Sequence, residues 1–99
     1  MQLDKQQQLE LEAATFRRFI KHLDDNKEVQ NIDLMITADF CRNCLSKWML
    51  KEASDMQLDM QIEDAHLQVY KMPYIEYKEK HQIRATQAQL DAFNAKKKT

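Results

Sequence analysis

The sequence contains no glycine, whereas average usage would give a chain of 99 residues about seven. This absence excludes the glycine-rich phosphate loop, the dinucleotide-binding turn and the nucleophile elbow of α/β-hydrolases. Each of these motifs requires a backbone geometry or a close approach that glycine supplies. The absence also disfavours tight β-hairpins, whose preferred turns need positive φ angles.

An excess of charge of one sign is also missing, because 15 Lys and Arg residues nearly balance 16 Asp and Glu residues. A nearly neutral protein exerts no general attraction on nucleic acids or anionic lipids, so a partner would have to recognise a local surface. No apolar run approaches the length of a membrane span, and the N-terminus lacks the pattern of a signal peptide. We therefore expect a cytoplasmic protein without membrane contact, in which both cysteines remain thiols.

The residues that are present favour helices throughout the chain. Ala, Leu, Glu, Gln, Lys and Met are abundant, and no segment shows the clean period of two that is typical of strands. The sequence predicts one all-α domain, residues 1–99, folded as a compact bundle of four to five helices. A polar N-terminus, about residues 1–8, is expected to fray, and a basic tail, about residues 95–99, is expected to be disordered.

The second predicted helix, about residues 31–53, is expected to be the central helix of the bundle. Its apolar residues fall within one broad arc at helical spacing, which predicts a buried face. That arc consists of Leu34, Ala38, Cys41, Cys44, Leu45, Trp48 and Met49, and Arg42 lies outside it. Further apolar residues beyond the arc are Ile32, Met35, Ile36, Phe40 and Leu50. We therefore expect this helix to contact neighbours on more than one side.

Shorter patterns predict the remaining helices. The first, about residues 4–25, should be anchored only through its second half, and Asn26 is expected to close it in the left-handed conformation. A further helix is predicted at about residues 60–71 and another after Pro73. The spacing of Thr86 and Gln89 is that of a capping box and predicts a last short helix, with Leu90 and Phe93 facing inward.

Three short motifs occur in a fixed order: VQNIDLM at 29–35, FCRNCLSKW at 40–48 and MPY at 72–74. In this combination the chain resembles a family of short bacterial proteins catalogued as domain of unknown function 1244, over about residues 16–93. The resemblance implies a small all-helical fold and no established function. The family pattern has glycine where this chain has Asp39 and Lys71, and a helix-closing residue at position 71 would favour glycine or asparagine.

Cys41 and Cys44 are three positions apart, so both sulfur atoms are expected on one side of the predicted helix. The leading interpretation treats them as inert core thiols, with no cofactor. The alternative is a metal-binding or thiol redox site. Zinc or iron would need two further ligands, for which His22 and His81 are the candidates. A thioredoxin-like role is disfavoured because the predicted helix begins well before the pair, away from the free N–H groups that lower a thiol pKa.

The leading functional hypothesis is a non-enzymatic module that associates with itself or with another protein. It rests on the six methionines and on the apolar residues left over beyond the arc, which would suit an adaptable interface. The competing interpretation is that neighbouring helices simply cover these residues.

Nucleic-acid binding is a weaker hypothesis. It depends on one basic cluster, Arg17, Arg18, Lys21 and His22, and on a second, Lys78, Lys80 and Arg84 near Tyr74 and Tyr77. Glu76 and Glu79 are interleaved with the second cluster, and a functional basic patch usually lacks such compensation.

Overall fold

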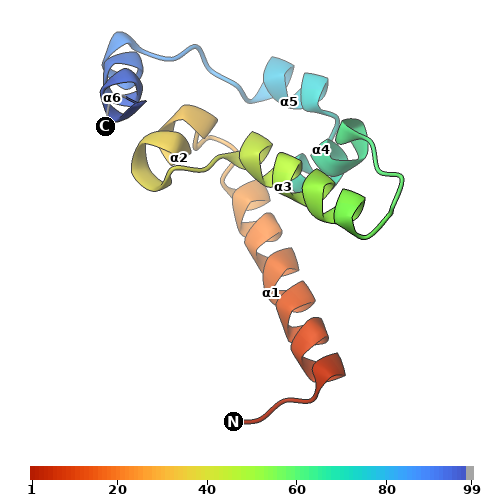
Figure 1. Ribbon diagram of the computed structural model, residues 1–99. Helices are drawn as coiled ribbons and strands as arrows, with labels where there is room; N and C mark the ends of the chain where they lie inside the picture. Colours follow the sequence, from red (N-terminus) through yellow and green to blue (C-terminus); the bar gives the residue numbers. More distant parts are fainter. Residues whose placement is uncertain (98–99) are drawn as a thin grey trace.

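The computed structural model describes residues 1–97, and all regular secondary structure in that range is helical (Figure 1). The described residues form six helices: α1 (Lys5–Asp25), α2 (Asn31–Ala38), α3 (Arg42–Asp55), α4 (Ile62–Tyr70), α5 (Tyr74–Lys80) and α6 (Gln87–Lys97). The all-α prediction is confirmed. The prediction of four to five helices with a continuous central one is wrong. No helix within residues 1–97 has the length and apolar character needed to cross a lipid bilayer.

The predicted central helix, residues 31–53, is broken into α2 and α3. The break begins at Asp39, which has a left-handed backbone with φ 61° and donates its N–H to the carbonyl of Met35. Cys41 then has an extended backbone and is the N-cap of α3. The apolar pattern continues through the break, and no glycine marks the left-handed position. Helical periodicity alone therefore could not reveal it.

Since the predicted arc spanned two separate helices, the buried face of α3 also differs from the predicted one. Arg42, Leu45, Ser46 and Ala53 are its buried residues. Trp48, which was expected inside, is 54% exposed, and its ring centroid lies 6.5 Å from that of Phe40. α3 therefore buries the polar residues Arg42 and Ser46 as well as the apolar residues Leu45 and Ala53.

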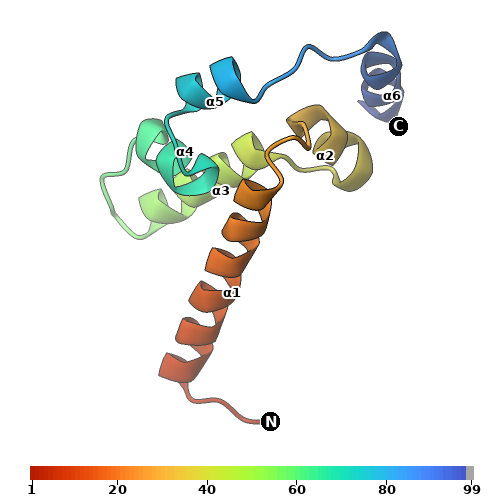
Figure 2. The same ribbon diagram turned by 180° about the vertical axis from the view of Figure 1, so that it is seen from behind.

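The core lies where the C-terminal half of α1 meets α3, α4 and α5 (Figures 1 and 2). Its buried apolar residues are Ile20, Leu23, Leu45, Val69, Tyr70 and Tyr77. α4 and α5 lie close to the predicted segments, and α5 begins directly after Pro73. The core thus gathers four helices at one end of the molecule.

At the other end, α6 packs on α2 (Figures 1 and 2). The predicted capping box is confirmed, because the N–H of Gln89 donates to Thr86 Oγ1 and the N–H of Thr86 donates to Gln89 Oε1. The segment predicted as a disordered tail, residues 95–99, is helical as far as Lys97, and residues 98–99 lie outside the described part. Lys96 Nζ donates to the carbonyls of Met35 and Ile36, which attaches this segment to the end of α2.

The N-terminal half of α1 (residues 5–15) projects away from the core (Figure 1). Every residue from 1 to 15 is exposed, which agrees with the prediction that only the second half of this helix is anchored. The radius of gyration is 15.8 Å, above the roughly 13 Å of a compact domain of this size. The helix begins at Lys5, after the N-cap Asp4, so fraying of residues 1–8 stays a prediction. The molecule is less compact than the predicted bundle.

Within residues 1–97, three residues other than glycine adopt a left-handed backbone, with φ 61° at Asp39, Gln57 and Lys71. Asp39 and Lys71 close α2 and α4. Both are positions where the resemblance implies glycine, which has no Cβ atom to strain this conformation. Asn26 closes α1 with φ −125°, so the prediction that it is left-handed is wrong.

We predict that Lys71→Gly raises the free energy of unfolding by about 0.5–1 kcal/mol, because the relief of left-handed strain exceeds the extra backbone entropy of glycine. Urea denaturation measures this change. The matched control is Lys47→Gly in the exposed middle of α3, which should lower the free energy of unfolding by about 1 kcal/mol. Equal losses in both variants would show that Lys71 is not strained.

Candidate functional site

The side chain of Arg42, at the start of α3, is enclosed by the protein and only 2% exposed. Its guanidinium donates to the carbonyl oxygens of Val29 at 2.7 Å, Asn26 at 3.0 Å and Leu23 at 3.4 Å. It also donates to Asn31 Oδ1 at 3.1 Å. These acceptors are neutral, and those at the C-terminal end of α1 carry the negative end of the helix dipole. A single cation thus terminates α1 and orders the loop that follows.

Aromatic and amide groups extend this network around Arg42. The Cζ atom of Arg42 lies 5.4 Å from the centroid of the Tyr77 ring, a distance that allows a cation–π interaction. Asn31 Oδ1 also accepts from the N–H of Arg42, and Asn31 Nδ2 donates to the hydroxyl of Tyr70. The network therefore connects α1, α2, α3, α4 and α5. The placement of Arg42 outside the buried face is wrong, because its acceptors come from distant segments that periodicity does not reveal.

We predict that Arg42→Lys lowers the free energy of unfolding by about 2–4 kcal/mol, since an ammonium cannot reach four acceptors and leaves buried carbonyls unpaired. Chemical denaturation followed by circular dichroism measures the loss. Arg18→Lys, on the exposed side of α1, is the matched control and should change stability by less than about 0.5 kcal/mol. A similarly small change in the free energy of unfolding of both variants would show that Arg42 does not have this structural role.

Gln30 is a second buried polar residue, 7% exposed, and it attaches the segment after α5 to the rest of the protein. Its Oε1 accepts from the N–H of Ile83 at 2.8 Å, and its Nε2 donates to the carbonyls of His81 and Glu28. Both hydrogen-bonding groups of the amide are satisfied. The extended segment 81–86 is therefore held at a fixed distance from α2.

Cys41 and Cys44 lie side by side, as predicted, with 3.5 Å between their sulfur atoms. Their place in the fold was predicted wrongly, because Cys41 is the N-cap of α3 and Cys44 lies in its first turn. The N–H of Cys44 donates to Cys41 Sγ at 3.5 Å. Burial raises the pKa of the Cys41 thiol above its ordinary value, and this effect outweighs the backbone N–H groups that favour the thiolate. Cys41 therefore ionises only at alkaline pH.

The four candidate metal ligands do not form one ligand cluster in the structure. His22 is exposed in the last turn of α1, and the ring of His81 lies beyond α5, 5.7 Å from that of Tyr77. Within residues 1–97, no group of three or more His, Cys, Asp or Glu side chains is placed to hold a metal ion. Zinc or iron binding by Cys41, Cys44, His22 and His81 stays a prediction.

The third histidine, His66, is buried on α4 and contacts Asn43 of α3. Its Nε2 atom lies 3.2 Å from Asn43 Oδ1, and its ring packs against those of Tyr70 and Tyr74. Burial lowers the pKa of His66, which favours the neutral imidazole. A neutral ring suits an aromatic cluster of this kind.

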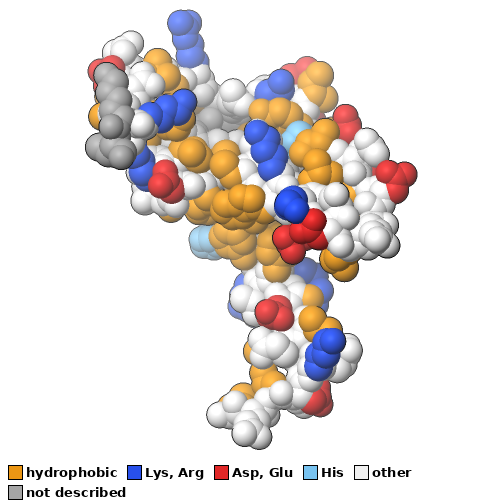
Figure 3. Space-filling view, in the orientation of Figure 1, with side chains coloured by type: hydrophobic (Ala, Val, Ile, Leu, Met, Phe, Trp, Pro, Cys, Tyr) orange, Lys and Arg blue, Asp and Glu red, His pale blue; other side chains and the backbone are white. Residues whose placement is uncertain are grey.

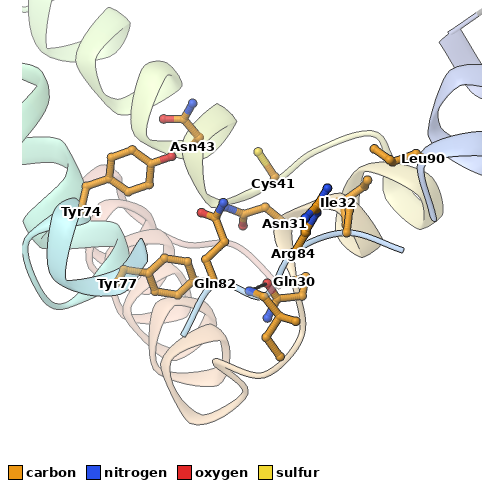
Figure 4. Close-up of a pocket in the computed structure, with 12 residues that line it drawn as sticks. Gln30, Asn31, Ile32, Cys41, Asn43, Tyr74, Tyr77, Gln82, Arg84 and Leu90 are labelled. Atoms are coloured by element: carbon orange, nitrogen blue, oxygen red, sulfur yellow. Dashed lines mark hydrogen bonds between the residues drawn. The ribbon is translucent and has the colours of Figure 1, made fainter. Parts of the chain in front are cut away.

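A cavity of about 540 Å³ opens between α2, the N-terminus of α3, α5 and segment 81–86 (Figure 4). Its polar lining residues are Gln30, Asn31, Asn43, Tyr74, Tyr77, Gln82 and Arg84, and no Asp or Glu belongs to the lining. The sequence placed Arg84 near Tyr74 and Tyr77, and the structure brings these three residues to the same cavity. The cavity itself was not predicted, because it depends on the long-range contact between Gln30 and Ile83.

The fold is thus that of a small helical protein organised around a buried cation, with a cysteine pair and a polar cavity beside it. The family described as protein of unknown function (DUF1244) matches residues 29–95, and the chain belongs to this family. The matched part contains Arg42, both cysteines and the whole lining of the cavity, whereas α1 precedes it. No match to the chain is found among curated proteins.

Proposed function

We propose that the protein is a non-enzymatic module that associates with a second copy of itself through α1. The observation that carries this proposal is the projecting N-terminal half of α1, where Leu9 is 50% and Leu11 is 53% exposed. An isolated helix of fewer than about 12–15 residues is marginal in water. Leu11 shares one face of α1 with Phe16 and Phe19, and a second helix packed against Leu11 would stabilise the projecting half.

The side of α1 offers a groove for such a helix. Its open apolar hollow is lined by Gln8, Leu11, Glu12, Thr15, Phe16 and Phe19. Hydrophobic side chains gather at the base of α1 and recur along its projecting half (Figure 3). The hollow therefore continues from the anchored half of the helix into the exposed half, long enough for another helix to lie along it.

The distribution of charge favours an antiparallel second copy as the occupant. In the middle of α1, Glu10 and Glu12 precede Arg17 and Arg18, whereas Lys5 and the pair Asp24 and Asp25 lie at the two ends of the helix. An antiparallel arrangement places Glu10 and Glu12 of each helix beside Arg17 and Arg18 of the other and opposes the two helix dipoles. In a symmetric register, Leu11 packs against Phe16 of the second copy.

We predict that the protein forms a concentration-dependent dimer and that Leu11→Asp makes it monomeric, because a carboxylate would be buried in the apolar contact. Sedimentation equilibrium measures the dissociation constant. Leu58→Asp is the matched control, since Leu58 is also 53% exposed but lies in the loop between α3 and α4. A wild-type protein that stays monomeric would overturn the proposal, and so would a dimer that persists in the Leu11→Asp variant. Binding of a different protein to α1 would also contradict it, because the proposed partner is a second copy of this chain.

A thiol redox site at Cys41 and Cys44 is the second candidate function. The observation that favours it is the 3.5 Å separation of the two sulfur atoms at the start of α3. In this chemistry, a thiolate attacks an oxidising disulfide and releases one thiol, and the second cysteine then displaces the other. The pair loses two protons and two electrons, and the external disulfide becomes two thiols. A metal on the same pair would need ligands beyond these two sulfurs.

For this candidate we predict that oxidised glutathione converts the native protein to an intramolecular disulfide, with a mass lower by two hydrogen atoms. The rate should keep rising above pH 9.0, the ordinary Cys value, because burial raises the pKa of Cys41. Mass spectrometry after acid quenching follows the reaction. Cys44→Ser should stop at the mixed disulfide with glutathione, and a wild-type protein that also stops there would exclude the redox role.

A further inference from the structure

We propose that the cavity between α2, α3, α5 and segment 81–86 is a binding site for a small organic anion with a flat apolar body. Its volume of about 540 Å³ falls in the range of ligand pockets, roughly 300–1,000 Å³. Two hydrogen bonds of Gln30 fix one wall, one that its amide donates to the carbonyl of His81 and one that it accepts from the N–H of Ile83. The cavity is thus formed before any ligand arrives.

An unpaired hydroxyl group points to a missing acceptor in this region. Tyr77 is only 1% exposed, and its hydroxyl lies near the guanidinium of Arg42 without forming a well-aligned hydrogen bond to it or to another group among residues 1–97. Buried polar groups without partners are rare in folded proteins. The neighbouring buried tyrosine, Tyr70, has its hydroxyl satisfied by Asn31. Tyr74 and Tyr77 both line the cavity, and Figure 4 shows their rings extending from α5 toward it. A ligand oxygen that reached the Tyr77 hydroxyl would satisfy it.

The charges around the cavity favour an anion. The lining contains no carboxylate, and Arg84 contributes a guanidinium from the exposed segment after α5. Cys41 and Asn43 place the N-terminus of α3 at the same cavity, and a helix N-terminus carries partial positive charge. Since Asn43 Oδ1 faces His66, the Nδ2 group of Asn43 is left as a donor. Positive charge from Arg84 and from the N-terminus of α3 is therefore present at the cavity without a carboxylate in its lining.

Apolar side chains on the opposite wall favour a ligand with an apolar body. Ile32 and Leu90 lie across the cavity from the two tyrosine rings (Figure 4), and Ile83 also belongs to the lining. A flat or branched group could lie between these surfaces while its charged end faces Arg84 and the start of α3. Carboxylates and phosphate esters share this chemistry.

The test is a titration of the full chain with sodium benzoate, followed by amide chemical shifts in NMR spectra. Benzamide is the matched neutral probe, and inorganic phosphate is the second anion. We expect saturable shifts at Asn43, Ile83 and Arg84 with an anion, and affinity at least about tenfold weaker for benzamide. Saturation by benzoate assigns the carboxylate class, and saturation by phosphate alone assigns the phosphate class.

Three variants separate binding from folding. Arg84→Gln should weaken anion affinity about tenfold without changing the unfolding transition, because Arg84 is exposed. Tyr77→Phe should also weaken binding while leaving stability unchanged or higher, since it removes an unpaired hydroxyl. Tyr70→Phe, the control, should lower stability and keep the affinity.

Three results would overturn the proposal. The first is the absence of saturable shifts with either anion. The second is equal affinity for benzoate and benzamide, which would show that charge is not recognised. The third is unchanged anion affinity in both Arg84→Gln and Tyr77→Phe, which would place binding elsewhere. None of these results bears on the association through α1, whose readout is the oligomeric state.

Discussion

A buried cation that is stabilised by hydrogen bonds to backbone carbonyls organises this protein. Transfer of a guanidinium into the interior is strongly unfavourable unless its donors are paired, so the surrounding chain must present acceptors at fixed positions. Arg42 receives them from the end of α1, the following loop and Asn31. The termination of α1, the start of α2 and the start of α3 are therefore consequences of one interaction, which also positions the ring of Tyr77.

The functional features follow from the geometry of that network. α3 begins at Arg42, where Asn31 fixes the chain, and this leaves the thiol pair at a helix N-terminus with Cys41 as the N-cap. Gln30, which is also buried and polar, hydrogen-bonds to segment 81–86 and so holds this segment as one wall of the cavity. The N-terminal half of α1 extends beyond the reach of the network, and it is the part of the helix with apolar side chains left to pair.

The sequence predicted those features whose signals are local. Thr86 and Gln89 predict the start of α6, because both residues of a capping box lie within four positions. The spacing of Phe16, Ile20 and Leu23 predicts which half of α1 is anchored in the core. Prediction from the sequence failed for features that depend on contacts between residues far apart in the chain. Asp39 ends α2 without the glycine that would signal a left-handed cap, and Arg42 is buried only because distant carbonyls converge on it. The cavity depends on a contact between residues 30 and 83, which no local pattern encodes.

Native-state hydrogen exchange under increasing denaturant measures most directly whether the Arg42 network joins these segments, since it reports the free energy of opening at each amide. The amides of Val29, Leu45 and Ile83 lie in three segments connected through Arg42 and Gln30. If the network holds the protein together, these amides will exchange through one global opening with a common free energy, while those of residues 8–15 exchange through local opening. Exchange of Val29 and Ile83 through local openings of much lower free energy than that of Leu45 would show that Arg42 does not join them.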